Sequence, residues 1–263
     1  MRKFKAIAKK GFKNMMYYKS QNFLGLFTSI VGIIMMQFFW RAMYADKNII
    51  NSTSLQQMLL YSSMSWFLNL FNYEDLQNEI INDIKTGNIN SKLLYPINYL
   101  FYMFSKSFGN QIWMFLFKGT PIILFIAVFL NPQINLSIGS IVFFIITALL
   151  GNLMLCMMNM IISLASFTWI EVSGLFIIKD ILVNFFSGLI IPTWFYPEFI
   201  QGLVNVLPFQ YMIQVPLAIL CNRIEANEAM VSVRIQCLWI LIFIILLKLI
   251  WARNTKRMES LGG

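Results

Sequence analysis

The sequence contains no histidine and few charged residues, which make up only 12% of its 263 positions. Histidine is the usual general base, the usual proton shuttle and the commonest metal ligand, so its absence removes several common chemistries together. The long apolar runs of the chain also hold no pair of carboxylates that would serve acid-base catalysis. An intramembrane enzyme is therefore disfavoured, and we assign no catalytic residue.

Cysteine is scarce, and a phosphate-binding loop is missing. Cys156, Cys221 and Cys237 lie far apart and form no C-x-x-C pair, which indicates neither a metal site nor a disulfide framework. No G-x-x-x-x-G-K-[ST] motif occurs in the sequence, so the chain cannot bind ATP in the manner of P-loop proteins. We therefore expect this chain to bind no metal and no cofactor of its own.

Apolar residues dominate what remains. Hydrophobic residues make up 59% of the chain and the mean hydropathy is +0.69, which exceeds what a soluble core of this size can hide. The net charge of +9 does not indicate nucleic-acid binding, because the cations follow the sides of a membrane. The composition predicts an all-α, polytopic membrane protein with a single transmembrane domain over residues 1–263.

Apolar runs of roughly 20 residues recur along the chain, and each coils into a helix that matches a hydrocarbon layer of about 30 Å. We predict about six spans. Their ranges are 23–40, 54–71, 100–130, 138–169, 172–191 and 233–251, and residues 119–121, Gly-Thr-Pro, are expected to bend the third. An even number of spans puts both termini on one side, and the basic residues near both ends indicate the cytosol.

The first 20 residues predict an amphipathic helix that lies on the membrane surface. At about 100° per residue, one arc collects apolar side chains, namely Phe4, Ile7, Ala8, Phe12 and Met15. Arg2 and five lysines cover the opposite face. Such a helix lies in the headgroup layer of an anionic inner leaflet. A signal peptide would need an uninterrupted apolar stretch and a cleavage site, so we expect residues 1–20 to stay in the mature chain.

The loop at residues 72–98 predicts a short cytosolic helix over residues 73–87. Asn72 is placed to cap its start, Lys85 falls in its last turn, and Gly87 is placed to end it in the left-handed conformation.

Two stripes run along this helix with a spacing of four residues. The apolar stripe consists of Leu76, Ile80 and Ile84. The acidic stripe consists of Asp75, Glu79 and Asp83. Like charges at this spacing repel by a few tenths of a kcal/mol per pair, and a basic partner would relieve them. The alternative interpretation is the solvated face of an ordinary loop helix.

Residues 192–220 are apolar but broken by prolines, namely Pro192, Pro197, Pro208 and Pro216. Proline at this density excludes one straight helix. We predict a re-entrant segment of short helices that dips into the outer leaflet and returns, which is tolerated where protein surrounds the backbone.

Apart from Lys106, Arg234 and Lys248 near the ends of their ranges, three charged residues fall inside the predicted spans: Lys118, Lys179 and Asp180. A charge at the bilayer centre costs at least about 2.5 kcal/mol, so it usually has a function. Neighbours on a helix point about 100° apart, so Lys179 and Asp180 are not expected to form a simple facing pair. One interpretation is a polar patch on a transport path or a dimer interface. The other places these residues near the cytosolic boundary, where the lysines snorkel.

The order of these parts resembles the type 2 family of ATP-binding-cassette exporter permeases. Two stretches carry the resemblance: I-x-x-G-N-I-x-x-x-L-L-x-P-I-N at residues 84–98, and the outer segment at 187–220. The latter contains a G-x-x-x-P-x-x-x-x-P pattern and an L-P-F-x-Y pattern that includes Phe209. Together with the span count, they cover nearly the whole chain.

The resemblance implies a permease subunit of the plasma (inner) membrane with cytosolic termini and the partners of an exporter. These are two copies of a separate ATPase, which bind ATP and Mg, and a second permease, identical or related. The helix at 73–87 would be the coupling helix, with its apolar stripe as the anchor and its acids gripping a basic rim. The alternative is an ion-gradient-driven secondary transporter or channel that uses Lys118, Lys179 and Asp180 as a relay, although only one broken segment is present where paired inverted repeats are expected.

Overall fold

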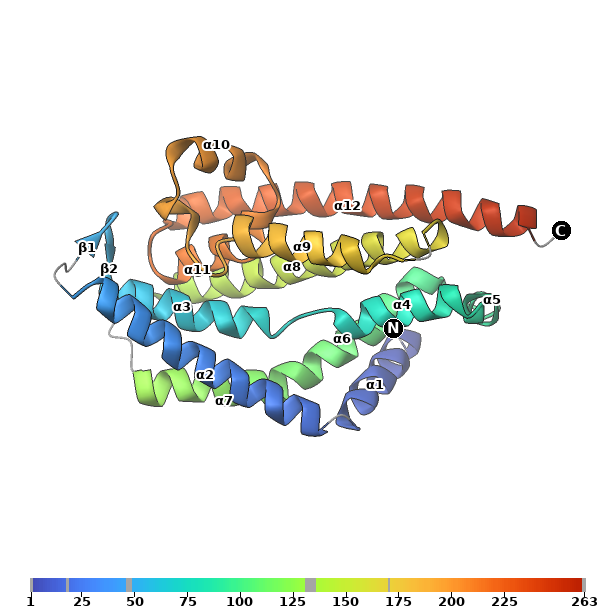
Figure 1. Cartoon of the computed structure of the whole chain (residues 1–263), viewed down its shortest axis with the longest axis horizontal. Helices are drawn as coiled ribbons and strands as arrows, with labels where there is room; N and C mark the ends of the chain where they lie inside the picture. Colours follow the sequence, from blue (N-terminus) through green and yellow to red (C-terminus); the bar gives the residue numbers. More distant parts are fainter. Residues whose placement is uncertain (1, 18, 46–48, 131–135, 170, 262–263) are drawn as a thin grey trace.

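A computed structural model describes residues 2–17, 19–45, 49–130, 136–169 and 171–261. Residues 1 and 18, within the predicted surface helix, lie outside the described residues. Apart from one short hairpin of strands β1 (Ile49–Ile50) and β2 (Thr53–Ser54), the described elements are helical, which confirms the all-α prediction. The helices lie mostly along one long axis (Figure 1). Their bounds are α1 Arg2–Met16, α2 Lys19–Met43, α3 Leu55–Asn69, α4 Glu74–Lys85, α5 Asn88–Leu93, α6 Tyr99–Met114, η1 Phe115–Gly119, α7 Thr120–Phe125, η2 Ile126–Leu130, α8 Ile138–Ser163, η3 Leu164–Phe167, α9 Ser173–Phe186, η4 Thr193–Phe195, α10 Glu198–Val206, η5 Phe209–Tyr211, α11 Gln214–Leu220 and α12 Ala226–Leu261.

Four of the described helical stretches are long and apolar enough to cross a membrane, by length and composition. They are Ser20–Met43, Tyr99–Leu130, Ile138–Phe167 and Asn227–Lys256. The other two predicted spans correspond to shorter helices, since α3 has 15 residues and α9 has 14. The α9 helix ends early because Gly188 adopts the left-handed conformation, with φ 73°, shortly before Pro192.

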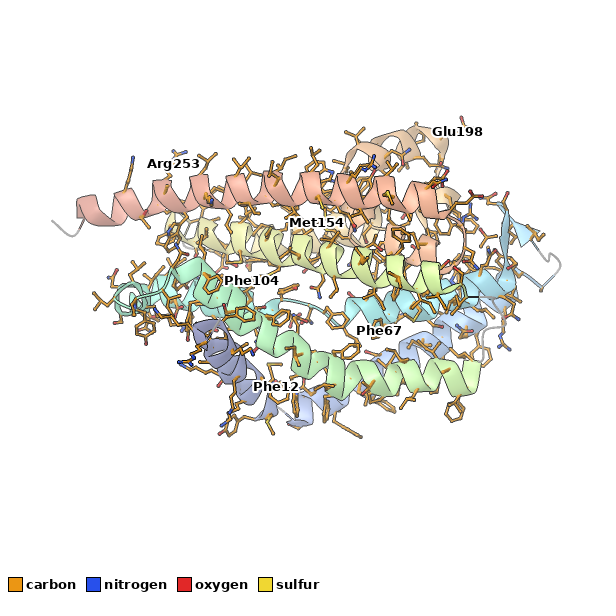
Figure 2. The ribbon with its side chains drawn as sticks, turned by 180° about the vertical axis from the view of Figure 1, so that it is seen from behind. Phe12, Phe67, Phe104, Met154, Glu198 and Arg253 are labelled. Atoms are coloured by element: carbon orange, nitrogen blue, oxygen red, sulfur yellow. The ribbon has the colours of Figure 1, made fainter. Side chains whose placement is uncertain are left out.

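The outer faces of the long helices carry large apolar side chains. Phe38 on α2 is 71% exposed, Phe129 is 74% exposed and Leu149 on α8 is 64% exposed. A water-soluble protein would not expose apolar surface on this scale, so these faces suit contact with lipid. Figure 2 shows such side chains along the whole bundle, with Glu198 and Arg253 toward opposite ends of its long axis.

The helix of the predicted third span is continuous from Tyr99 to Leu130 but changes its winding. Residues Phe115–Gly119 and Ile126–Leu130 are π-helical, and Pro121 lies in the first turn of the short α-helical stretch between them. Proline lacks the amide hydrogen that an α-helix needs, and π-turns take up the mismatch. The first π-helical stretch ends at Gly119, where the Gly-Thr-Pro sequence predicted a bend.

Helix α1 crosses α6 at very close range. A Cβ atom added at Gly109 of α6 would lie 2.7 Å from the carbonyl carbon of Ala8, and one added at Gly11 would lie 3.0 Å from the carbonyl carbon of Lys106. Small residues on both helices therefore allow backbone contact, as at helix crossings in membranes. Ile7 and Met15 are buried beside this crossing, in agreement with the predicted apolar arc.

The proline-broken segment folds as short helices between α9 and α12. Helix α10 lies on the outside, whereas α11 is buried throughout and packs on α8 and α3 (Figure 1). Pro192 precedes η4, Pro197 caps α10, and Pro208 precedes η5. Pro216 lies in the first turn of α11, where its missing amide hydrogen costs no helical hydrogen bond.

Candidate functional site

Helix α4 is built into the fold of the chain. It packs against α6, α8 and η3 at the end of the bundle that also holds α1 (Figure 1). Leu76 is 3% exposed and Ile80 is 0% exposed, and both join a cluster with side chains of α6, α8 and α12. Ile84 is half-buried against the same cluster. The structure thus differs from the expectation that this stripe anchors a partner, because the stripe already packs inside the chain.

The helix starts one residue later than its sequence suggested. Tyr73 occupies the N-cap position without a side-chain cap, and its hydroxyl donates hydrogen bonds to Asn152 of α8. Asn72 does not cap the helix, and its carbonyl accepts a hydrogen bond of 2.8 Å from Gln111 Nε2. At the other end Gly87 has φ 73°, the left-handed conformation expected of it.

The acidic stripe also has partners within the chain. Lys106 of α6 lies 2.6 Å from Glu79 Oε2, and Lys92 of α5 lies 3.0 Å from Glu79 Oε1. Lys92 also lies 2.6 Å from Asp83 Oδ2, which accepts a further hydrogen bond of 2.8 Å from the Tyr99 hydroxyl. The basic partner that the stripe needs is thus supplied by the next two helices. This ionic cluster of Glu79, Asp83, Lys92, Lys106 and Tyr99 joins α4, α5 and α6.

The ionic cluster shifts the pKa values of its members in the directions of a formed network. Burial alone would raise the pKa of Glu79, yet Lys106 and Lys92 together hold it below its ordinary value. Burial would lower the pKa of Lys92, but the hydrogen bonds to Asp83 and Glu79 raise it. Both charges are therefore favoured at neutral pH.

Asp75 lies outside this network. Its side chain is on the exposed side of α4, and partial burial against neighbouring elements raises its pKa, with Lys106 opposing that effect. Lys85 is exposed as well and lies 3.9 Å from Glu171, a separation at which an exposed pair contributes little. Asp75, Lys85 and Gly87 are thus the predicted coupling residues that remain accessible from outside.

The most exposed apolar surface of this end is the turn after α5. Leu93 is 39% exposed, Leu94 is 85% exposed and Tyr95 is 48% exposed. This exposed turn, Leu93–Tyr95, begins at the last residue of α5 and leads from the α4–α5 hairpin toward α6. The sequence signal is an apolar Leu-Leu-Tyr-Pro run inside a polar loop, and the predicted coupling residues did not include it.

Lys179 and Asp180 of α9 form an ion pair of 2.6 Å. The expectation that they do not form a facing pair was wrong, because a lysine side chain is long and flexible enough to reach the carboxylate of its neighbour. Lys179 also donates a 3.0 Å hydrogen bond to Asn159 Oδ1, close to the end of α8. Neighbouring Met160 packs in the same cluster as Leu76 of α4, so Lys179 lies level with α4.

Lys118 and the Lys179–Asp180 pair belong to different parts of the bundle. The Nζ atom of Lys118 lies over α2, and a Cβ atom added at Gly25 would be 2.7 Å from it. The charge of Lys118 also acts to lower the pKa of Asp75 on α4. Among the described residues no ion pair joins it to Lys179 or Asp180. The structure therefore does not assemble the three charges into one relay.

Polar side chains tie the proline-broken segment to the long helices. Gln236 of α12 donates hydrogen bonds of 2.7 Å to the carbonyl of Tyr211 and 2.9 Å to that of Thr147 on α8. The hydroxyl of Tyr61 on α3 donates 2.7 Å to the Gly188 carbonyl. Phe209 stacks on Phe186 at the end of α9. These contacts join the segment and the residues before it to the surrounding helices, and no local sequence pattern indicates them because their partners are distant along the chain.

Comparison with known proteins gives one finding. The family model described as ABC-2 family transporter protein matches residues 30–262, which is most of the chain. Neither the search of curated proteins nor that of solved structures gives a match. The matched region runs from within α2 to the end of α12 and so includes the ionic cluster, the exposed turn and the proline-broken segment. A match of this extent shows the family, and the chain belongs to the ABC-2 family of membrane transporter proteins.

Proposed function

We propose that this chain is the membrane-spanning permease subunit of an ATP-driven exporter whose ATPase is a separate polypeptide. Family membership supports the transport role, and the missing P-loop motif requires another chain to bind ATP and Mg. Two ATPase copies and a second permease, identical or related, complete the proposed assembly. It lies in the plasma (inner) membrane, with both termini in the cytosol and about six spans that include α3 and α9.

The single observation that carries the proposal is the connection between the exposed turn and the long helix α6. The turn Leu93–Tyr95 is an apolar surface on a polar hairpin, which suits a groove on a partner protein. The hairpin is tied to α6 at two places, because Asp83 binds Tyr99 at the start of that helix and Glu79 binds Lys106 in its middle. A push on the turn would therefore be transmitted to a helix that continues to Leu130.

ATP-driven closure of the ATPase pair would supply that push and switch the cavity between the spans from inward to outward access. The π-helical stretches around Pro121 are the places where such a helix bends most easily. In this mechanism the coupling element is the whole α4–α5 hairpin. Its buried apolar stripe and the ionic cluster hold the hairpin rigidly against the spans, and the exposed turn contacts the ATPase.

The second permease is proposed to cover the outer face of α9. Asp180 has 60% of its side chain exposed, and Ile181 beside it is 61% exposed. Its ion pair with Lys179 leaves this carboxylate exposed among apolar residues, where a protein surface with polar groups is a better neighbour than lipid.

Co-expression with any P-loop ATPase that a neighbouring gene encodes tests the proposal. The tagged permease should retain the ATPase through purification, and the complex in lipid nanodiscs should hydrolyse ATP with vanadate sensitivity. Failure of any neighbouring ATPase to associate, together with transport driven by an ion gradient alone, would contradict it.

A further inference from the structure

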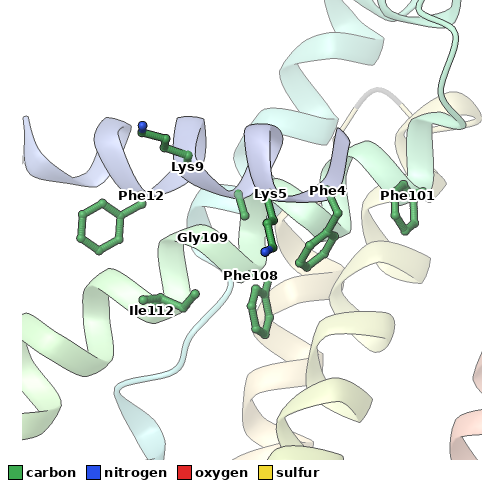
Figure 3. Close-up of a pocket in the computed structure, with 9 residues that line it drawn as sticks. Phe4, Lys5, Lys9, Phe12, Phe101, Phe108, Gly109 and Ile112 are labelled. Atoms are coloured by element: carbon green, nitrogen blue, oxygen red, sulfur yellow. The ribbon is translucent and has the colours of Figure 1, made fainter. Parts of the chain in front are cut away.

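An apolar groove runs along the crossing of α1 and α6. Its volume is about 720 Å³, within the range of roughly 300–1,000 Å³ typical of sites for small molecules. Rings of Phe4 and Phe12 from α1 and of Phe108 from α6 line it, and Ile112 extends the apolar wall (Figure 3). The groove is therefore suited to a hydrocarbon chain.

The shape of the groove is set by the close helix crossing. Ala8 and Gly109 meet backbone to backbone at its floor, so the walls are the larger side chains on either side. Phe4 also contacts Phe108, with ring centroids 5.5 Å apart, and Phe12 meets Trp113 edge to face at 5.2 Å. These ring contacts hold the aromatic walls in place, and the groove is part of the fold.

Two cations belong to the groove, Lys5 and Lys9. Figure 3 shows the amino group of Lys5 directed between the two helices beside Phe108, whereas Lys9 points away on the opposite edge. Helix α1 contains no acidic residue, and among the described residues neither lysine forms an ion pair. An ammonium group beside an apolar wall is best neutralised by an anion that carries its own hydrocarbon.

We propose that this groove binds an anionic phospholipid, with one acyl chain along the aromatic wall and the phosphate held by Lys5. A free phosphate would leave the apolar wall bare. A second copy of the chain would bring another cationic α1 to the same place, and like charges oppose that contact. The lipid would hold α1 against α6 next to Lys106, so anionic lipid would stabilise the region that carries the ionic cluster. The inference goes beyond the proposed function, because it requires neither an ATPase nor transport.

Native mass spectrometry of the purified full-length chain in detergent tests this, with phosphatidylglycerol and phosphatidylcholine of identical acyl chains added in turn. Each lysine near an anionic headgroup is worth about fivefold in affinity. The wild type should retain phosphatidylglycerol preferentially, and Lys5→Gln should bind it about fivefold more weakly. The control Lys10→Gln removes the same charge from α1 outside the groove and should bind as the wild type does. Equal losses in both variants, or equal retention of the two lipids by the wild type, would overturn the proposal.

The acyl chain is tested separately. Phe108→Asn places an amide in the apolar wall at a side chain that is already 44% exposed, and it should weaken phosphatidylglycerol retention several-fold. Leu116→Asn changes a residue of the same continuous helix that is 51% exposed and does not line the groove, and should have no effect. Glycerophosphoglycerol, the headgroup without its acyl chains, should not bind or compete. Retention unaffected by Phe108→Asn, or competition by the bare headgroup, would show that the groove is not the binding site.

Discussion

The ammonium nitrogen of Lys92 lies 2.6 Å from the Oδ2 carboxylate oxygen of Asp83. Lys92 is in the last turn of α5 and Asp83 is near the end of α4, so this contact closes the hairpin around Gly87. The Tyr99 hydroxyl donates to the same oxygen, which fixes the closed hairpin to the first residue of α6. The proposed transmission from the exposed turn to the spans depends on these contacts.

Replacing Lys92 by methionine should loosen the hairpin. Asp83 has only 4% of its side chain exposed, and an unpaired buried carboxylate is strongly unfavourable, so we expect a loss of roughly 2–3 kcal/mol. Hydrogen exchange of the α4–α5 amides should increase, and the co-purified ATPase should decrease. Lys85→Met, which removes an exposed lysine 3.9 Å from Glu171, is the matched control and should change neither. Identical behaviour of the two variants would argue against a role for the ionic cluster.

The stability of the hairpin should fall in acid. The pKa of Glu79 is below its ordinary 4.5, so its ion pairs contribute fully above that value and are lost as the pH falls through the lowered pKa. The pKa of Lys92 is above its ordinary 10.5, so its contribution is full below that value and is lost only as the pH rises through the raised pKa. Limited proteolysis of the hairpin should therefore be constant between these two values and increase below the lower one. The variant Glu79→Gln should show a smaller increase of proteolysis at low pH than the wild type. If its increase at low pH equals that of the wild type, the effect arises from other groups.

The packing of the proline-broken segment on α8 should be sensitive to one methyl group. A Cβ added at Gly151 would lie 2.9 Å from the Cα of Met212, which is backbone and cannot move aside alone. Gly151→Ala should therefore lower thermal stability in detergent by about 1–3 kcal/mol, as overpacking does. Gly174→Ala is the control, since nothing lies within 4 Å of its added Cβ. Equal melting temperatures for the two variants would mean that the segment does not pack on α8 as described.

The outer face of α9 should meet a second permease. The variant Ile181→Cys is made in a background where Cys156, Cys221 and Cys237 are serine. If the two permeases are identical and meet at α9, this cysteine should form a disulfide between two copies. A disulfide requires the two Cα atoms to lie about 4.4–6.8 Å apart, so it forms only at a close contact. Leu241→Cys, on α12 and 57% exposed, should not. Cross-linking at Leu241→Cys alone would move the interface to α12, and cross-linking at neither site would favour a different permease as partner.

The long apolar spans were predictable because their signal is local. The third span was predicted to begin at residue 100, and its helix begins at Tyr99. Backbone sterics predicted the left-handed conformation of Gly87 and the helix breaks at Pro192, Pro197 and Pro208. The lengths of α3 and α9 were overestimated, because hydropathy does not reveal where a helix yields to an extended or left-handed residue.

The environment of α4 was not predictable from its own residues. A four-residue repeat shows that Leu76 and Ile80 share a face, but it does not say whether that face meets the same chain or another. Lys106 pairs with Glu79 across 27 positions of sequence, so no local pattern revealed it. Lys179 and Asp180 were expected to diverge because rotation per residue describes the helix backbone and ignores the reach of a lysine side chain.

The affinity of the partner ATPase for a permease altered at the exposed turn tests the central claim most directly. Leu94 is 85% exposed and makes the turn apolar, so Leu94→Asp should leave the fold intact and weaken ATPase binding by at least about tenfold, the effect of losing an interface anchor worth about 1.4 kcal/mol or more. Asn78→Asp, which adds the same charge on the exposed side of α4, should bind the ATPase as the wild type does. Binding of the ATPase to Leu94→Asp at wild-type affinity, with normal membrane insertion, would contradict the account.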